Sequence, residues 1–238
     1  MGKVGKKYAA AASKVDDKRI YNVKDAVELV KAVSYSTFDG TVELHMRTTL
    51  DPRRADQAIR GVVRLPNGLG KSVRVLVFAA GEAARAAQEA GADYIISDDE
   101  GIQKILGGWT DFDVAIAVPD MMRHVGRLGR VLGPRGLMPT PKTGTVVPED
   151  DVARVVDEAK AGRVEYRLDR SGNIHCPIGK VSFSDEQLIG NMAAVMSTIR
   201  RARPAAAKGL FIRHVTLAPT MGPGVKVDPA EALEMESA

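Results

Sequence analysis

The sequence is poor in cysteine and in aromatic residues, and it lacks long apolar runs. Cys176 is the single cysteine of the 238 residues. A single cysteine excludes an internal disulfide framework and a cysteine-rich zinc site. The lack of disulfides fits a reducing compartment. No apolar run reaches the roughly 18 residues that span a bilayer, and the N-terminus lacks the apolar segment of a signal peptide. We therefore expect a cytoplasmic protein with no membrane partner.

Acidic residues are absent from two long stretches of a chain whose net charge is +4. None lies between Asp120 and Glu149 or between Glu186 and Asp228, although both stretches contain several lysine and arginine residues. Solvated surfaces are the usual reason for a single charge run, but two such runs favour a nucleic acid as the partner. Aromatic residues form only 5% of the chain, which argues against broad stacking on a single strand and favours recognition of a folded RNA by its shape.

The hydrophobic pattern predicts two kinds of sheet. The runs VRVLVFAA, DYIIS and DVAIAVP alternate with helical segments, as in a parallel sheet covered on both faces. Before and after them, residues 41–50 and 163–179 alternate between polar and apolar, and the second segment contains the turn residues of a hairpin. We also expect helices over 23–33, capped by Asn22, and over 185–201.

These patterns predict an α/β and α+β fold. Residues 1–69 and 160–238 form a split α+β domain, and residues 70–159 form an inserted Rossmann-like parallel α/β domain. The connections at 66–70 and 161–162 would act as a double hinge. Residues 1–20 are expected to be a mobile basic arm, and residues 228–238 a disordered acidic tail. The glycine- and proline-rich segment 126–145 is expected to be a shaped loop, neither helix nor strand.

An α/β enzyme acting on a nucleotide or a phosphorylated substrate is the alternative interpretation. GLGKS at 68–72 is an incomplete phosphate loop, because Leu65 replaces its first glycine and a strand follows it instead of a helix. His175 and Cys176 are neighbours on a predicted strand and so point to opposite faces, which excludes a catalytic pair between them. The other histidines show no metal-binding spacing. We therefore predict no cofactor and no metal.

Three segments resemble one protein family: DPRRADQAIRGVVRLPNGLGKSVRV, VLGPRGLMPTPKTGTV and TMGPGVKV. They are similar to the bacterial L-one family of large-subunit ribosomal proteins, and the similarity extends from about Tyr21 to Val227. The resemblance implies a split RNA-binding domain with an inserted second domain. It also implies a non-enzymatic component of the 50S subunit, which binds the stalk region of large-subunit ribosomal RNA. Members of the family help deacylated tRNA leave the exit site, and in bacteria they commonly repress translation of their own operon mRNA.

The resemblance also indicates which residues contact RNA. The principal surface comprises Ser36, Phe38, Thr41, Glu43, Thr220, Met221 and Gly222. A secondary contact in the inserted domain comprises Arg127, Arg130, Arg135 and Lys142. Two positions depart from many relatives: Thr37 replaces a lysine, and Pro219 replaces a hydroxyl residue and removes a backbone donor. For Phe38, a position in the core is the competing interpretation.

Overall fold

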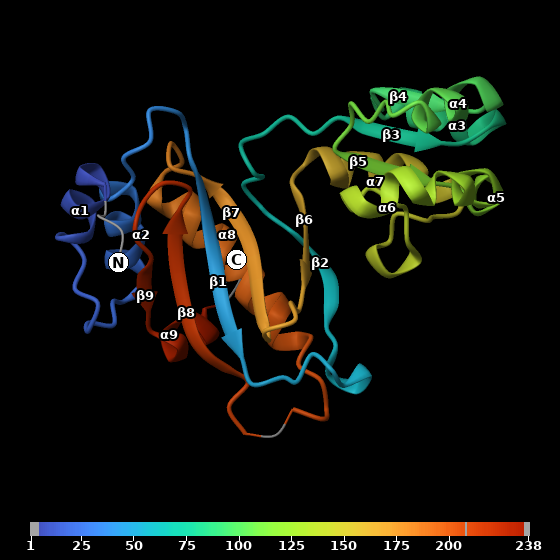
Figure 1. The fold of residues 1–238 in the computed structure, drawn as a ribbon. Coiled ribbons are helices and arrows are strands. Elements are labelled where there is room, and N and C mark those ends of the chain that lie inside the picture. Colours follow the sequence, from blue (N-terminus) through green and yellow to red (C-terminus); the bar gives the residue numbers. More distant parts are fainter. Residues whose placement is uncertain (1–4, 208, 236–238) are drawn as a thin grey trace. The chain divides into compact units, whose positions relative to one another are not determined.

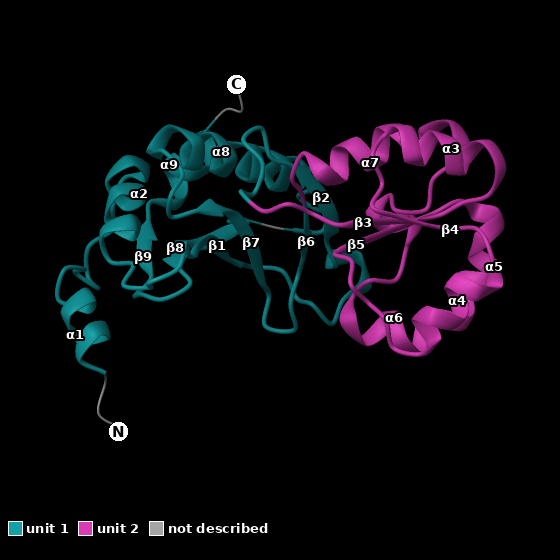
Figure 2. Cartoon of the chain, turned by 90° about the horizontal axis from the view of Figure 1, so that it is seen from above, with its two compact units in different colours: residues 1–70, 164–238 teal, residues 71–163 magenta. Residues whose placement is uncertain are grey.

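The computed structural model describes residues 5–207 and 209–235 (Figure 1). The chain divides into two compact units, coloured separately in Figure 2. Unit 1 contains residues 1–70 and 164–238, and unit 2 contains residues 71–163. Unit 2 is therefore an insertion between the two halves of unit 1.

Unit 1 is built on a four-stranded antiparallel sheet in the order β7-β1-β8-β9. Its strands are β1 (Thr41–Thr48), β7 (Asn173–Lys180), β8 (Ile212–Pro219) and β9 (Val225–Val227). One face is covered by α2 (Val23–Ala32), α8 (Asp185–Arg201) and α9 (Pro229–Glu234), as Figure 2 shows. Along β1, Val42, Leu44 and Met46 are buried against these helices, whereas the alternate residues lie on the open face.

The two long helices of unit 1 begin at the expected residues. The Asn22 side chain accepts a hydrogen bond from the Asp25 N–H, which caps α2. Ser184 and Gln187 form a reciprocal capping box at the start of α8. Both helix predictions are confirmed.

The predicted hairpin over 163–179 forms only at its turn, where Leu168 and Ile174 make an antiparallel bridge. Strand β6 (Arg163–Arg167) pairs with β2 (Arg60–Arg64) in a separate two-stranded sheet, while β7 pairs with β1. The turn between β6 and β7 forms as expected, because the Asp169 carboxylate accepts hydrogen bonds from the Ser171 and Asn173 N–H groups. Beyond the turn the two strands belong to different sheets, although the alternate residues of both are buried in the same core.

Unit 2 contains a parallel sheet in the order β4-β3-β5 with helices on both faces (Figure 2). The strands are β3 (Val75–Phe78), β4 (Tyr94–Ile96) and β5 (Val114–Ala117). Helices α3 (Gly81–Glu89) and α7 (Val152–Lys160) pack on one face. Helices α4 (Asp99–Leu106), α5 (Met122–Val125) and α6 (Gly129–Arg135) pack on the other. The predicted mixed fold is therefore confirmed.

Segment 126–145 is largely helical, so the prediction of a loop is wrong. A 3-10 helix (Gly126–Leu128) joins α5 to α6, and a second one (Pro141–Thr143) follows. Val125, Leu128 and Leu132 are buried at helical spacing, and this apolar stripe outweighs the poor helix propensity of glycine. Helix α6 ends at Gly136, whose φ of 71° favours glycine.

Both terminal predictions need correction. Residues Lys6–Ala12 form helix α1, in which Ala11 is buried. The acidic tail includes helix α9, where Ala232 is buried and the Glu231 carboxylate accepts a hydrogen bond from the Val23 N–H. Helix α9 thus docks on unit 1 at the start of α2. Residues 1–4 and 236–238, which also belong to the predicted arm and tail, lie outside the described residues.

Within the described ranges, no helix is both long and apolar enough to cross a membrane.

Candidate RNA-binding surface

Two distant chain segments meet where β1 begins and β8 ends. The Thr41 N–H donates to Thr220 Oγ1 over 2.8 Å, and the Thr220 N–H donates to the Thr41 carbonyl over 2.9 Å. The Thr220 hydroxyl also donates to this carbonyl over 3.2 Å. The structure therefore brings together the two halves of the residue set that the family resemblance indicated, although they lie 179 positions apart.

Two large apolar side chains are exposed beside this junction. Phe38 is 58% exposed and Met221 is 41% exposed, so Phe38 is not a core aromatic residue. The backbone around them is fixed, because the Ser36 hydroxyl donates to the Phe38 carbonyl and the Tyr35 N–H donates to the Met221 carbonyl. We name the set Ser36, Phe38, Thr41, Glu43, Lys180, Thr220, Met221 and Gly222 the junction surface.

Gly222 is required by packing within the protein. A Cβ atom at this position would lie 2.6 Å from Pro219 Cγ and 2.9 Å from the Val33 carbonyl oxygen. Contacts this close force either the helix end or the strand end to move. Because Gly222 has no side chain, its backbone can pack closely against Pro219 and the Val33 carbonyl oxygen.

Lys180 belongs to this surface and was missed by the sequence analysis. Its Nζ donates to Thr41 Oγ1 over 3.0 Å and to the Asp39 carbonyl over 3.4 Å. The contact arises because Thr41 and Lys180 are direct partners in the β1–β7 pairing. No spacing in the sequence indicates this register, since the two strands are far apart in the chain.

Glu43 lies two residues after Thr41 on the same face of β1, and its carboxylate faces His45. Its Oε2 is 3.7 Å from His45 Nε2, and His45 Nδ1 is 2.8 Å from His175 Nδ1. The sequence pattern did not pair these histidines with each other, but they are direct partners across β1 and β7. Burial, together with the neighbouring His175, lowers the pKa of His45 despite the opposing effect of Glu43.

Cys176 points to the core side of β7, opposite to His175. It is fully buried, and burial raises the pKa of its thiol to about 12. A thiol in this state is a poor nucleophile at neutral pH. The structure therefore supports the expected buried cysteine beside an exposed histidine.

The cations of the secondary contact lie on the segment from α5 to the second 3-10 helix. All four side chains are exposed: Arg127, Arg130, Arg135 and Lys142. None forms an ion pair with a residue in the described ranges. Their charges are therefore available to an anionic partner.

Packing does not require the two glycines that lie beside Arg127 and Arg130 in the sequence. Gly126 and Gly129 have ordinary helical backbone angles, and an added Cβ would meet no atom within 4 Å. Gly133 differs, because it precedes Pro134 and a side chain there would crowd the proline ring. Glycine in a helix costs about 0.5–1 kcal/mol relative to alanine, so Gly126 and Gly129 weaken the helix without an internal gain.

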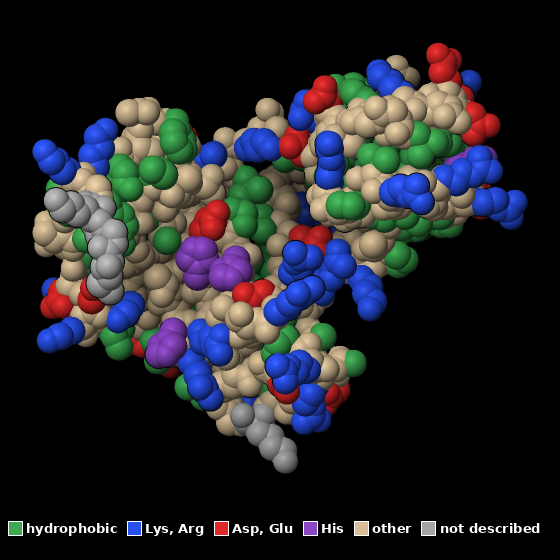
Figure 3. Space-filling model, in the orientation of Figure 1, with side chains coloured by type: hydrophobic (Ala, Val, Ile, Leu, Met, Phe, Trp, Pro, Cys, Tyr) green, Lys and Arg blue, Asp and Glu red, His purple; other side chains and the backbone are tan. Residues whose placement is uncertain are grey.

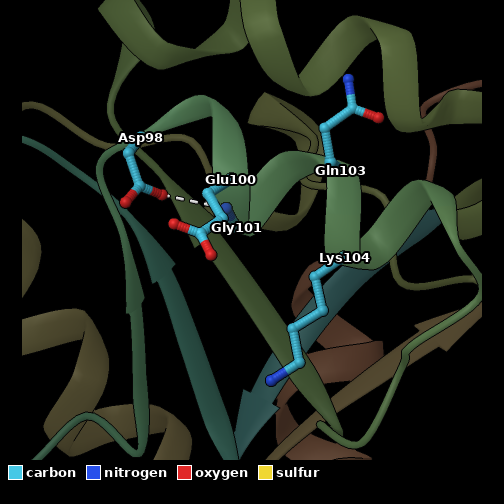
Figure 4. Close-up of a pocket in the computed structure, with 5 residues that line it drawn as sticks. All are labelled: Asp98, Glu100, Gly101, Gln103 and Lys104. Carbon is cyan, nitrogen blue, oxygen red and sulfur yellow. Dashed lines mark hydrogen bonds between the residues drawn. The ribbon is translucent and has the colours of Figure 1, made fainter.

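Unit 2 also has an open pocket at the start of α4 (Figure 4), which bears on the enzyme alternative. It is lined by Asp98, Glu100, Gly101, Gln103 and Lys104. The Asp98 carboxylate already accepts the Gly101 N–H, a donor that a phosphate would need, and two carboxylates repel an anion. Within the described residues, no group of three or more His, Cys, Asp or Glu side chains forms a metal site. This pocket therefore does not support the enzyme alternative.

Comparison with known proteins shows the family of the chain. Residues 30–223 match the profile of the Ribosomal protein L1p/L10e family. Two relatives, each called large ribosomal subunit protein uL1, come from Chloroflexus aurantiacus strains J-10-fl and Y-400-fl. Each is 57% identical over 237 residues, and the alignment covers 100% of both chains. The chain therefore belongs to the Ribosomal protein L1p/L10e family.

Proposed function

We propose that this protein is a non-enzymatic constituent of the large ribosomal subunit, located on cytoplasmic ribosomes, and that its junction surface binds the stalk region of the large ribosomal RNA. The observation that carries the proposal is the junction of Thr41 and Thr220, with Phe38 and Met221 exposed beside it. A rigid surface of hydroxyl, apolar and cationic groups suits a folded RNA, whose shape and ribose hydroxyls are read together.

The groups of the junction surface have complementary tasks. Phe38 and Met221 provide apolar contacts to an exposed sugar or base. Thr220 Oγ1 accepts one hydrogen bond and donates another within the protein, which leaves an acceptor site for a ribose 2′-hydroxyl. Lys180 supplies positive charge for a phosphate. Glu43 orients His45 or accepts a hydrogen bond from a ribose.

The cations of unit 2 make the secondary contact. Arg127, Arg130 and Arg135 offer planar donor groups that match phosphate geometry, and Lys142 adds a fourth charge. Gly126 and Gly129 leave open space beside these cations, in which an RNA backbone could come close. Close approach of phosphate therefore accounts for two helix positions that packing leaves unexplained.

Exit-site tRNA requires a further cationic surface, and the two-stranded sheet provides one. Exposed arginines lie on β2, on β6 and on the adjoining segments: Arg53, Arg54, Arg60, Arg64, Arg167 and Arg170. Arg54 pairs with Asp56 and Arg60 with Glu165, which holds their guanidinium groups in place. We assign tRNA contact to this surface because arginine contacts to phosphates hold a nucleic acid in position whatever its sequence.

Repression of the protein's own operon mRNA would use the junction surface again. An mRNA segment that repeats the shape of the ribosomal stalk would compete for the same hydroxyl and apolar groups. The two RNAs would therefore exclude each other.

Chemical footprinting on intact large-subunit ribosomal RNA tests the proposal. We expect protection confined to the stalk region, and loss of this protection when the leader of the protein's own operon mRNA is added in excess. Protection elsewhere, or none, would contradict the assigned RNA. Protection that persists in the presence of excess leader would contradict the shared surface alone. Turnover of a free nucleotide would favour the enzyme alternative instead.

A further inference from the structure

An exposed aspartate stands beside the junction surface, where a face that binds RNA is expected to be basic. Asp39 directly follows Phe38, and both residues are exposed. Lysine and arginine side chains predominate over acidic ones on the face of the molecule that Figure 3 shows. A carboxylate repels the phosphates of a bound RNA, so an acid at this position needs a compensating role.

The Asp39 carboxylate is bound to a distant segment of the chain. Its Oδ1 accepts a hydrogen bond from the Ser182 N–H over 3.1 Å, and its Oδ2 accepts one from the Ser182 hydroxyl over 2.7 Å. Ser182 lies in the connection between β7 and α8, 143 positions away along the chain. Both carboxylate oxygens are therefore engaged by the protein itself.

The backbone around Asp39 is bound to the same connection. The Val181 N–H donates to the Gly40 carbonyl over 2.9 Å, and Lys180 Nζ donates to the Asp39 carbonyl over 3.4 Å. We name residues 36–40 the Phe38 loop. The Phe38 loop is thus joined to the β7–α8 connection by one carboxylate and by two backbone carbonyls.

Phe38 depends on these bonds because the core does not hold its side chain, which is 58% exposed. Hydrogen bonds of Tyr35 and Thr41 fix the two ends of the Phe38 loop. Between these ends, the bonds from Asp39 to Ser182 hold the residue next to Phe38. The loop is therefore fixed on both sides of its exposed ring.

We propose that Asp39 is a positioning residue for RNA binding, whose carboxylate holds the Phe38 loop so that the Phe38 ring is already ordered when RNA arrives. The proposal rests on the RNA contact proposed above for the junction surface. A side chain that is ordered in advance loses less conformational freedom on binding, which strengthens affinity. This gain exceeds the repulsion between Asp39 and the RNA phosphates.

Electrostatics and positioning predict opposite effects when the charge of Asp39 is removed. Any neutral residue relieves the repulsion, so binding should tighten if charge alone matters. Alanine also removes both acceptors of Ser182 and frees the loop, so positioning predicts weaker binding. Asparagine removes the same charge but keeps both bonds, because its Oδ1 accepts the Ser182 N–H and its Nδ2 donates to the Ser182 hydroxyl. The two variants therefore differ in these bonds and not in charge.

Titration of the full chain with the stalk fragment of large-subunit ribosomal RNA, at one salt concentration, tests the proposal. We expect Asp39→Ala to weaken affinity by about two- to ten-fold, the cost of ordering one side chain. Asp39→Asn should bind at least as tightly as the unaltered protein. Asp17→Ala, which removes another exposed acid of unit 1, is the charge-matched control and should not weaken binding. Equal affinities for Asp39→Ala and Asp39→Asn would overturn the proposal.

The same titration in a Phe38→Ala background shows whether Asp39 acts through Phe38. With the ring removed, Asp39→Ala should no longer weaken binding, because no exposed ring remains to be ordered. An undiminished loss in this background would overturn the positioning role, since Asp39 would then act on RNA by another route.

Hydrogen exchange of the free protein separates a failure of this proposal from a failure of the proposed function. The Ser182 amide should exchange slowly in the unaltered protein and in Asp39→Asn, and faster in Asp39→Ala. If this pattern holds but the unaltered protein shows no specific binding of the stalk fragment, the RNA assignment is wrong and the positioning role is overturned with it. If specific binding holds but the exchange is equal in all three proteins, this proposal alone is overturned.

Discussion

The junction surface of unit 1 and the cationic segment of unit 2 differ in how their groups are held. Thr41 lies on β1, Lys180 lies on β7 and Thr220 directly follows β8, and hydrogen bonds of 2.8–3.2 Å join the three residues. Arg127, Arg130, Arg135 and Lys142 come from one contiguous segment and stand exposed without ion pairs to described residues. The first surface is preorganised by the fold, whereas the second is a set of free charges.

This difference assigns separate tasks to the two surfaces. Oriented hydroxyl groups discriminate between RNA shapes, because a poorly matched RNA leaves them unpaired. Free cations attract any phosphate backbone. Their contribution to affinity falls as the salt concentration rises, because the release of counterions from the RNA then becomes less favourable. We therefore expect specificity from unit 1 and salt-dependent affinity from unit 2.

Thr220→Val should have the largest effect on specificity. It removes the hydroxyl that faces RNA and leaves the Thr41 N–H without its partner, and we expect specific affinity to weaken by about 1–3 kcal/mol. Titration of the stalk fragment measures the loss, and chemical unfolding checks that the fold persists. Thr216→Val, on β8 and outside the junction surface, should bind normally. Unchanged affinity for Thr220→Val would remove Thr220 from the surface.

Gly222→Ala should damage the junction through packing. The added Cβ meets Pro219 and the Val33 carbonyl, so we expect the free energy of unfolding to fall by about 1–3 kcal/mol. Denaturant titration of the variant measures this change. An unchanged unfolding midpoint would show that the junction adapts, and would contradict its description as preorganised.

Arg135→Ala should have a smaller effect, on salt dependence. Loss of one phosphate contact reduces the slope of log affinity against log salt by about one, with little change in preference for the stalk. A series of affinities at several salt concentrations measures the slope. If the variant lost specific binding altogether, specificity would come from the cationic segment of unit 2 and not from the junction surface of unit 1.

Gly129→Ala should separate stability from binding. Alanine is the better helix former, so we expect the free energy of unfolding of unit 2 to rise by about 0.5–1 kcal/mol. The new methyl group should at the same time weaken RNA binding slightly, because it blocks close approach between the arginines. A rise in stability with no loss of affinity would mean that no RNA backbone contacts this helix.

Much of the fold could be predicted because local patterns determine it. The Asn22 cap, the alternation along β1 and the apolar strands of unit 2 each reflect burial or capping of neighbouring residues. The error at 126–145 has a physical cause as well. Glycine and proline dominated the interpretation, although Val125, Leu128 and Leu132 already had the helical spacing of a buried stripe.

The candidate site was harder to predict because strand register determines it. The family resemblance indicated Thr41 and Thr220, but no local pattern showed that they hydrogen-bond to each other. Lys180 and the pair of His45 and His175 depend on the pairing of β1 with β7, across more than 120 residues. Long-range pairing of this kind leaves no periodic signal in either strand alone.

The most direct test of the account is a salt series of affinities for the stalk fragment and for a duplex of equal length. The account predicts that both affinities fall with salt at similar slopes, while the stalk fragment keeps its advantage at every concentration, because the junction surface supplies it. Two coincident lines that vanish together at high salt would contradict the account and reduce both surfaces to a general attraction for polyanions.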